Sequence, residues 1–200
     1  MPDVAILDYG SGNLHSVARA IARVGGEPVV TGEPQVMAAA DGLVIPGVGR
    51  FGQCVGAIRR HGLETAIRGF AASGRHVIGV CVGMQVLFER SDEDEDAGLG
   101  MFPGDVRRLP PSVKVPHMGW NTVGWSTNHP FVNGIPDGTP FYFVHSYAPD
   151  VSEETVGVAE HGRRFAAAVA RKNLFATQFH PEKSGEAGLQ IYENVVKALA

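Results

Sequence analysis

The chain has 200 residues, a formal net charge of −4 and two cysteines. The length suits one domain, expected to span residues 1–200, and the absence of a basic cluster excludes a typical nucleic-acid surface. There is no disulfide framework, signal peptide, membrane-length apolar run or metal-type histidine spacing, so we expect a cytoplasmic protein without a metal.

Short apolar strands alternate with segments of helical periodicity in the first half. The sequence predicts strands at 4–7, 28–31, 43–45 and 76–78, and helices at 14–24, 36–40, 54–60, 63–72 and 84–90. Such alternation is typical of an α/β protein, and we expect a mainly parallel central sheet flanked by helices.

Beyond residue 96, glycine, proline and β-forming residues dominate, which predicts a β-rich second half of short, mostly antiparallel strands. Segments 164–170 and 174–179 are expected to pair as a hairpin. Apolar spacing from 189 to 199 predicts a last helix, for which Ser184 is a possible N-cap. The acidic run 92–96 is interpreted as a solvated loop.

Cys81 lies in a G-V-C-V-G run between the predicted strand at 76 and the helix at 84. This is the cysteine version of the strand–turn–helix nucleophile elbow, in which the flanking glycines permit a tight turn. The N–H groups of a helix start favour a thiolate, the nucleophilic form of cysteine. The alternative is a buried structural cysteine, which is the interpretation we prefer for Cys54.

A cysteine nucleophile requires a base and donors for an oxyanion. His180 precedes a proline and is therefore expected to be extended, which places Glu182 on the same side and predicts a Cys81–His180–Glu182 triad. Taken alone, a His-x-Glu pair is more often a surface feature. The backbone N–H of Val82 and one from Val48 or Gly49, in a glycine-rich loop, are candidate oxyanion donors.

The ordered motifs resemble those of class I, triad-type glutamine amidotransferases, and within them the glutaminase subunits of imidazole glycerol phosphate synthase. The resemblance covers nearly the whole chain and rests on LDYGSGNL at 7–14, PGVG at 46–49, GMQ at 83–85, HMGWN at 117–121, YFVHSY at 142–147 and FHPEKSG at 179–185.

The resemblance assigns further roles. It implies that Gln85 holds the substrate glutamine and that His145, Ser146 and Tyr147 bind its α-amino and carboxylate groups. It places Asn13, Trp120, Tyr142 and Lys183 at a partner interface. Without the family, these would be interpreted as a strand edge, core aromatic residues and a solvated lysine.

The implied reaction is hydrolysis of glutamine to glutamate and ammonia, with no cofactor. The implied partner is the cyclase subunit of the same synthase. This partner is expected to be a (β/α)8 barrel that uses the ammonia in histidine biosynthesis as one half of a heterodimer. Only one predicted helix follows Glu182, so we expect the ammonia acceptor to be another polypeptide. Two alternatives stay open: the glutaminase subunit of another synthase, for pyridoxal phosphate or anthranilate, and a non-catalytic binding module.

Overall fold

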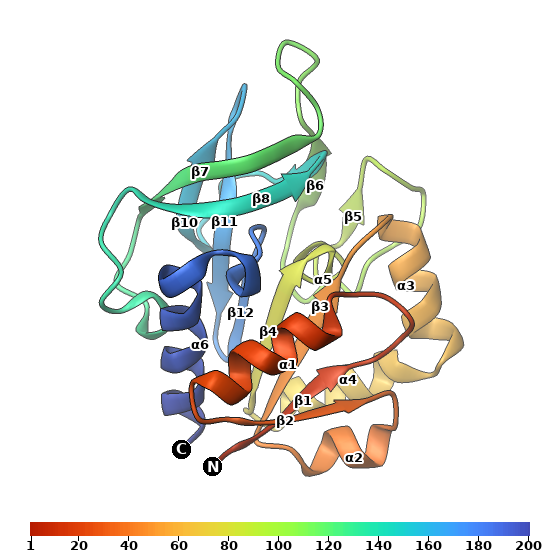
Figure 1. Ribbon diagram of the computed structural model, residues 1–200. Helices are drawn as coiled ribbons and strands as arrows, with labels where there is room; N and C mark the ends of the chain where they lie inside the picture. The colour runs from red at the N-terminus through yellow and green to blue at the C-terminus, as the bar shows by residue number, and fades with distance from the viewer.

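A nine-stranded mixed sheet runs through the computed structural model, which describes residues 1–200 (Figure 1). Its strand order is β2-β1-β3-β4-β12-β11-β10-β7-β8. The strands are β1 (Asp3–Leu7), β2 (Glu27–Thr31), β3 (Gly42–Gly47), β4 (His76–Cys81), β7 (His117–Trp125), β8 (Thr139–His145), β10 (Thr155–Glu160), β11 (Arg164–Arg171) and β12 (Leu174–Thr177). The predicted α/β class and the 164–179 hairpin are confirmed.

Parallel pairing is restricted to half of the sheet. The strands from β2 through β1, β3 and β4 to β12 are parallel, whereas those from β12 to β8 are antiparallel. The second half of the chain therefore extends the same sheet, with β12 joining β4 in parallel. Figure 1 shows β7 and β8 crossing beyond the carboxyl ends of the parallel strands, where active sites of α/β sheets lie.

Two groups of helices flank the parallel strands. The helices are α1 (Leu14–Arg23), α2 (Pro34–Ala39), α3 (Phe51–Arg60), α4 (Leu63–Ala72), α5 (Val82–Gln85) and α6 (Gly185–Leu199), with 3-10 turns η1 (Pro130–Val132) and η2 (Pro181–Lys183). α1 contacts α6, while α4 contacts both α2 and α3. None of these helices combines the length and apolar character needed to cross a membrane.

The helix predicted at 84–90 is wrong beyond Gln85. α5 is a single turn, and Arg90 already belongs to β5 (Arg90–Ser91) in a small sheet with β6 (Asp105–Arg108) and β9 (Tyr147–Pro149). The carbonyls that would continue the helix are used elsewhere, because those of residues 86–89 accept from the N–H groups of residues 98–102. A later loop thus takes the hydrogen bonds that the local sequence pattern assigned to a helix.

Ser184 does stand at the N-cap of the last helix, α6, but its hydroxyl does not cap it. The hydroxyl instead donates to the carbonyl of His180 at 2.6 Å and accepts from the N–H of Tyr142 at 3.0 Å. Ser184 therefore ties the backbone of η2 to β8.

Close backbone contacts explain two glycines beside the elbow. A Cβ at Gly83 would collide with the carbonyl of Ile45, and one at Gly47 would collide with the backbone N of Gly83. The end of β3 and the first turn of α5 thus touch through their main chains, which only glycine permits.

We expect Gly83→Ala to lower the free energy of unfolding by roughly 2–3 kcal/mol, because the backbone of β3 cannot yield as a flexible side chain would. Chemical denaturation measures the change. Gly69→Ala is the matched control, since an added Cβ at this exposed position in α4 meets nothing within 4 Å and should stabilise the protein slightly. Equal stability of the two variants would contradict the close approach.

Candidate active site

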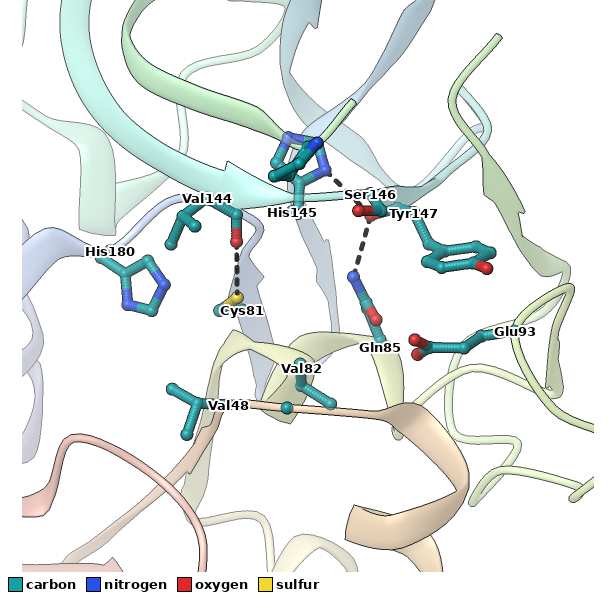
Figure 2. Close-up of a pocket in the computed structure, with 12 residues that line it drawn as sticks. Val48, Cys81, Val82, Gln85, Glu93, Val144, His145, Ser146, Tyr147 and His180 are labelled. Atoms are coloured by element: carbon teal, nitrogen blue, oxygen red, sulfur yellow. Dashed lines mark hydrogen bonds between the residues drawn. The ribbon is translucent and has the colours of Figure 1, made fainter. Parts of the chain in front are cut away.

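Cys81 occupies the turn between β4 and α5, as the elbow motif predicts. It is one of two non-glycine residues with positive φ, at φ 56° and ψ −115°, a sparsely populated conformation. Its sulfur lies at the wall of a cavity of about 270 Å³ (Figure 2). The strained turn places the sulfur beyond the strand end and at the first turn of a helix, the geometry of a nucleophile elbow.

His180 and Glu182 form a buried pair beside Cys81. The imidazole Nδ1 donates to Glu182 Oε1 at 2.8 Å, and the two side chains are 2% and 1% exposed. His180 lines the cavity with Cys81, and its Nε2 is buried without a hydrogen-bond partner of its own (Figure 2). Nδ1 is thus committed to the carboxylate, and Nε2 is the nitrogen left for chemistry.

The charge state of His180 depends on its neighbours. Burial lowers the pKa of the imidazole, but the Cys81 thiolate and the Glu182 carboxylate raise it more, so the net pKa lies above its usual value, at about 10. The imidazolium form of His180 is therefore favoured at neutral pH. Asn13 Nδ2 also donates to Glu182 Oε1, at 3.3 Å, and so helps to fix the carboxylate.

Glu182→Gln should lower the pKa of His180 and reduce the glutamine hydrolysis that the resemblance implies by about a hundredfold or more, because the imidazolium loses its buried counter-charge. NMR titration of labelled histidine measures the first effect and an activity assay the second.

The raised pKa of His180 also makes the stability of the fold depend on pH. The stability that this ion pair contributes is complete below the ordinary histidine pKa and is lost as the pH rises through the raised pKa of about 10. A variant with the same titration as wild type would contradict the pairing.

The residues predicted to supply oxyanion donors all reach the cavity, although the backbone N–H of Val48 is engaged by Ser11. Val48, Gly49 and Val82 line the cavity with Cys81. Val82 is the first residue of α5, where intrahelical bonds leave the N–H free. The N–H of Val48 donates to Ser11 Oγ at 3.3 Å, and the same hydroxyl donates to the carbonyl of Val48 at 2.7 Å. Ser11 therefore holds the Val48 peptide in this structure.

The four predicted substrate residues lie together at the other wall of the cavity. Gln85, His145, Ser146 and Tyr147 all line it. Gln85 Nε2 donates to the carbonyl of Tyr147 and to Gln178 Oε1, both at 2.9 Å, and His145 Nδ1 contacts the same Tyr147 carbonyl at 2.9 Å (Figure 2). With both N–H groups engaged inside the protein, Gln85 offers Oε1 to a ligand.

The interpretation of the run 92–96 as a solvated loop holds for the exposed residues Asp92, Glu95 and Asp96 but is wrong for Glu93 and Asp94. Glu93 lines the cavity, and its Oε2 accepts from the N–H of Phe51 at 2.8 Å, while Asp94 accepts from the N–H of Gly52 at 2.9 Å and from Arg50 at 2.7 Å. The carboxylates thus satisfy the free N–H groups at the start of α3, where negative charge is favoured. No local signal links positions 93 and 51, because the pairing is purely tertiary.

The four predicted interface residues gather beside the triad. Trp120 is 59% exposed and packs edge-on against Tyr142, with ring centroids 6.1 Å apart, and Lys183 Nζ lies 5.9 Å from the centroid of the Tyr142 ring. Asn13 is linked to this group by its hydrogen bond to the buried Glu182, the residue before Lys183. We call Trp120, Tyr142 and Lys183 the Trp120 patch; it combines an exposed aromatic residue with a cation, a composition typical of protein interfaces.

Comparison with known proteins agrees with this geometry. Residues 5–199 match the model of the family "Glutamine amidotransferase class-I". The chain therefore belongs to the class I glutamine amidotransferase family. It is 49% identical over 207 residues, or 98% of each chain, to the "Imidazole glycerol phosphate synthase subunit HisH" of Nocardia farcinica. It is 46% identical over 197 residues to the protein of the same name in Moorella thermoacetica, covering 97% of this chain and 94% of that one.

Solved structures share the fold at much lower identity. PurLQS from Thermotoga maritima gives a TM-score of 0.80 at 21% identity, covering all of this chain and 99% of that one. The glutaminase domain of CTPS from Trypanosoma brucei gives a TM-score of 0.69 at 15% identity, covering 98% of this chain and 94% of that one. Both confirm the α/β architecture.

Proposed function

We propose that this chain is the glutaminase subunit of an imidazole glycerol phosphate synthase and supplies ammonia for histidine biosynthesis. The observation that carries the proposal is Cys81, on a strained strand–helix turn, facing the buried His180–Glu182 pair across one cavity. The names of relatives at 42–49% identity favour this synthase over one for pyridoxal phosphate or anthranilate.

The reaction proceeds in two steps. The Cys81 thiolate attacks the amide carbon of glutamine, and the negative charge moves to the amide oxygen, where backbone N–H groups stabilise it. The C–N bond breaks as His180 Nε2–H protonates the departing nitrogen, leaving ammonia and a γ-glutamyl thioester. The now neutral His180 takes a proton from water, the hydroxide attacks the thioester, and glutamate and the thiolate are released. No step requires a metal or an organic cofactor.

The polar ends of the substrate fit the wall of the cavity that lies away from Cys81. Glu93 and Gln85 are neighbours there (Figure 2), and a carboxylate beside the free Gln85 Oε1 presents acceptors suited to the α-ammonium of glutamine. The Ser146 hydroxyl and the neighbouring backbone N–H groups supply donors for the α-carboxylate. The site thus favours free glutamine over a glutamine whose amino group is acylated.

Glu93→Gln should raise KM for glutamine about tenfold or more with little change in kcat, because it removes the charge that meets the α-ammonium but keeps an acceptor for the Phe51 N–H. Steady-state kinetics measure the change. Asp94→Asn is the matched control: it removes a charge that caps the same helix outside the cavity and should leave KM close to wild type. Equal KM values in both variants would contradict the assignment of Glu93.

The partner that we propose is the cyclase subunit, in the form of a (β/α)8 barrel, docked on the Trp120 patch. Ammonia that escapes into neutral water becomes ammonium, which is not a nucleophile, so transfer must take place within a closed interface. The patch supports this proposal because it adjoins η2, which carries the triad glutamate. Both cysteines are free, which supports a cytoplasmic location.

Isotope competition tests the proposal as a whole. The chain, mixed with its cyclase, receives amide-15N glutamine in the presence of excess unlabelled ammonium. We expect the imidazole product to carry 15N, since the ammonia does not mix with solvent. Unlabelled product, with glutamine still hydrolysed, would contradict transfer to the partner; an absence of hydrolysis would contradict the glutaminase itself.

A further inference from the structure

Two buried histidines form a cross-strand pair behind the substrate wall. His117 begins β7 and His145 ends β8, and the two residues are direct partners in the antiparallel register. They are 5% and 6% exposed, and His117 Nδ1 lies 2.9 Å from His145 Nε2. His145 lines the cavity, whereas His117 lies behind it and has no part in the reaction described above.

The inner end of this pair fixes one tautomer. His145 Nδ1 lies 2.9 Å from the carbonyl of Tyr147, which can only accept, so Nδ1 carries the proton. In a neutral ring, Nε2 then has a lone pair and must accept from His117 Nδ1–H. Figure 2 shows His145 above the Tyr147 carbonyl that Gln85 also contacts.

The outer end fixes the other tautomer. Asn121 Nδ2 lies 3.2 Å from His117 Nε2 and donates to the carbonyl of Glu160 at 2.9 Å, while its Oδ1 accepts from the N–H of Thr122 at 2.8 Å. These contacts set the orientation of the amide, so His117 Nε2 faces a donor and must accept. Both ends therefore require the same arrangement, with each imidazole neutral and protonated on Nδ1.

The chain of hydrogen bonds continues to the nucleophile. The Tyr147 carbonyl accepts from Gln85, Gln85 donates onward to Gln178, and Gln178 Nε2 lies 3.8 Å from Cys81 Sγ.

We propose that His117 is a positioning residue for glutamine hydrolysis. Its Nδ1–H fixes the tautomer of His145, and His145 in turn holds the Tyr147 carbonyl. That carbonyl orients the Gln85 amide so that Oε1 faces the substrate. The inference rests on the proposed glutaminase function and adds a residue outside the cavity to it.

Burial supports the neutral state of both rings. Burial, with the neighbouring His161, lowers the pKa of His117 to about 4. For His145, burial lowers the pKa to about 3, although the hydrogen bond to Tyr147 opposes the shift. A neutral dyad at working pH is what the oriented chain requires, since a second proton on His145 would set two N–H groups against each other.

Paired variants separate positioning from packing. Asparagine places an amide nitrogen where Nδ1 of histidine lies, whereas leucine fills space without a donor. In the presence of the cyclase, we expect His117→Leu to raise KM for glutamine about tenfold, because the buried His145 Nε2 loses its donor and the Gln85 amide loses its fixed orientation. His117→Asn should recover most of that loss. His161→Leu, which removes the imidazole stacked on His117 at 4.2 Å but no member of the chain, should leave KM unchanged.

Labelling and NMR complete the test. His117→Leu should slow labelling of Cys81 by an electrophilic glutamine analogue, while its reaction with iodoacetamide, which needs no substrate contacts, stays the same. In the wild-type protein, 15N shifts should show both rings protonated on Nδ1. A wild-type KM in His117→Leu, an equal loss in His161→Leu, or an Nε2–H tautomer at either ring would overturn the inference. Failure of the wild-type chain to hydrolyse glutamine would overturn the proposed function first.

Discussion

Cys81→Ala should reduce glutamine hydrolysis by several orders of magnitude while the fold survives. The Cys81 sulfur lines the cavity with His180, and the alanine side chain carries no nucleophile to replace it. Alanine tolerates the backbone at residue 81 no worse than cysteine does, because both side chains carry the same Cβ at φ 56°. A stopped assay of glutamate release, with circular dichroism for the fold, measures both quantities.

The control for this variant is ammonia itself. Supplied with ammonium salts at high pH, the Cys81→Ala chain in complex with the cyclase should form product at the wild-type rate, because the second reaction takes place on the partner. Equal loss of ammonia-dependent and glutamine-dependent synthesis would show that Cys81 supports the structure rather than the chemistry.

The chain alone should be a poor glutaminase, and the cyclase with its nucleotide ligand should raise the rate about a hundredfold or more. The reason is the Val48 peptide, whose N–H is bound to Ser11 and is not directed at the oxyanion. Gly49, at φ 91°, gives the next peptide the freedom to rotate. A partner that favours the rotated state supplies the second backbone N–H donor for the oxyanion. Glutamate release is measured for the chain alone, with cyclase, and with cyclase and ligand, and the comparison gives the increase in rate.

Ser11→Ala examines the same contact without the partner. Removing the hydroxyl that holds Val48 should raise the rate of glutamine hydrolysis by the isolated chain. It should also reduce the factor by which the cyclase increases that rate. If the three wild-type rates agree within error, the partner does not regulate the site and the chain is an autonomous glutaminase.

Local patterns predicted the parts of the site that are local in sequence. The G-V-C-V-G run describes a single turn, and His180 and Glu182 are only two residues apart, with Glu182 in the 3-10 turn η2 that follows the extended His180, so each feature is contained in a short segment. Glu93 was missed because its place in the cavity comes from capping a helix 42 residues earlier, and nothing in the acidic run encodes that contact.

Hydrogen-bond competition accounts for the other differences. The periodicity at 84–90 indicated a helix, yet the loop at 98–102 binds the same carbonyls. The direction of the Val48 N–H was equally beyond the sequence, because P-G-V-G specifies a flexible loop and Ser11, 37 residues away, selects its state. The sheet is mixed because β12 pairs in parallel with β4, a long-range contact that the composition of these segments does not predict.

The most direct test of the account uses both cysteines of the wild-type chain. The protein is treated with an electrophilic glutamine analogue, with and without excess glutamine, and the peptides that contain Cys81 and Cys54 are compared by mass spectrometry. Cys54 is an internal control, since its buried thiol is hydrogen-bonded near Ser11 and Val48 rather than facing the substrate cavity. We expect the label on Cys81 alone, and glutamine to block it. A label shared equally by both cysteines, or one on Cys81 that glutamine does not block, would contradict a glutaminase site at this elbow.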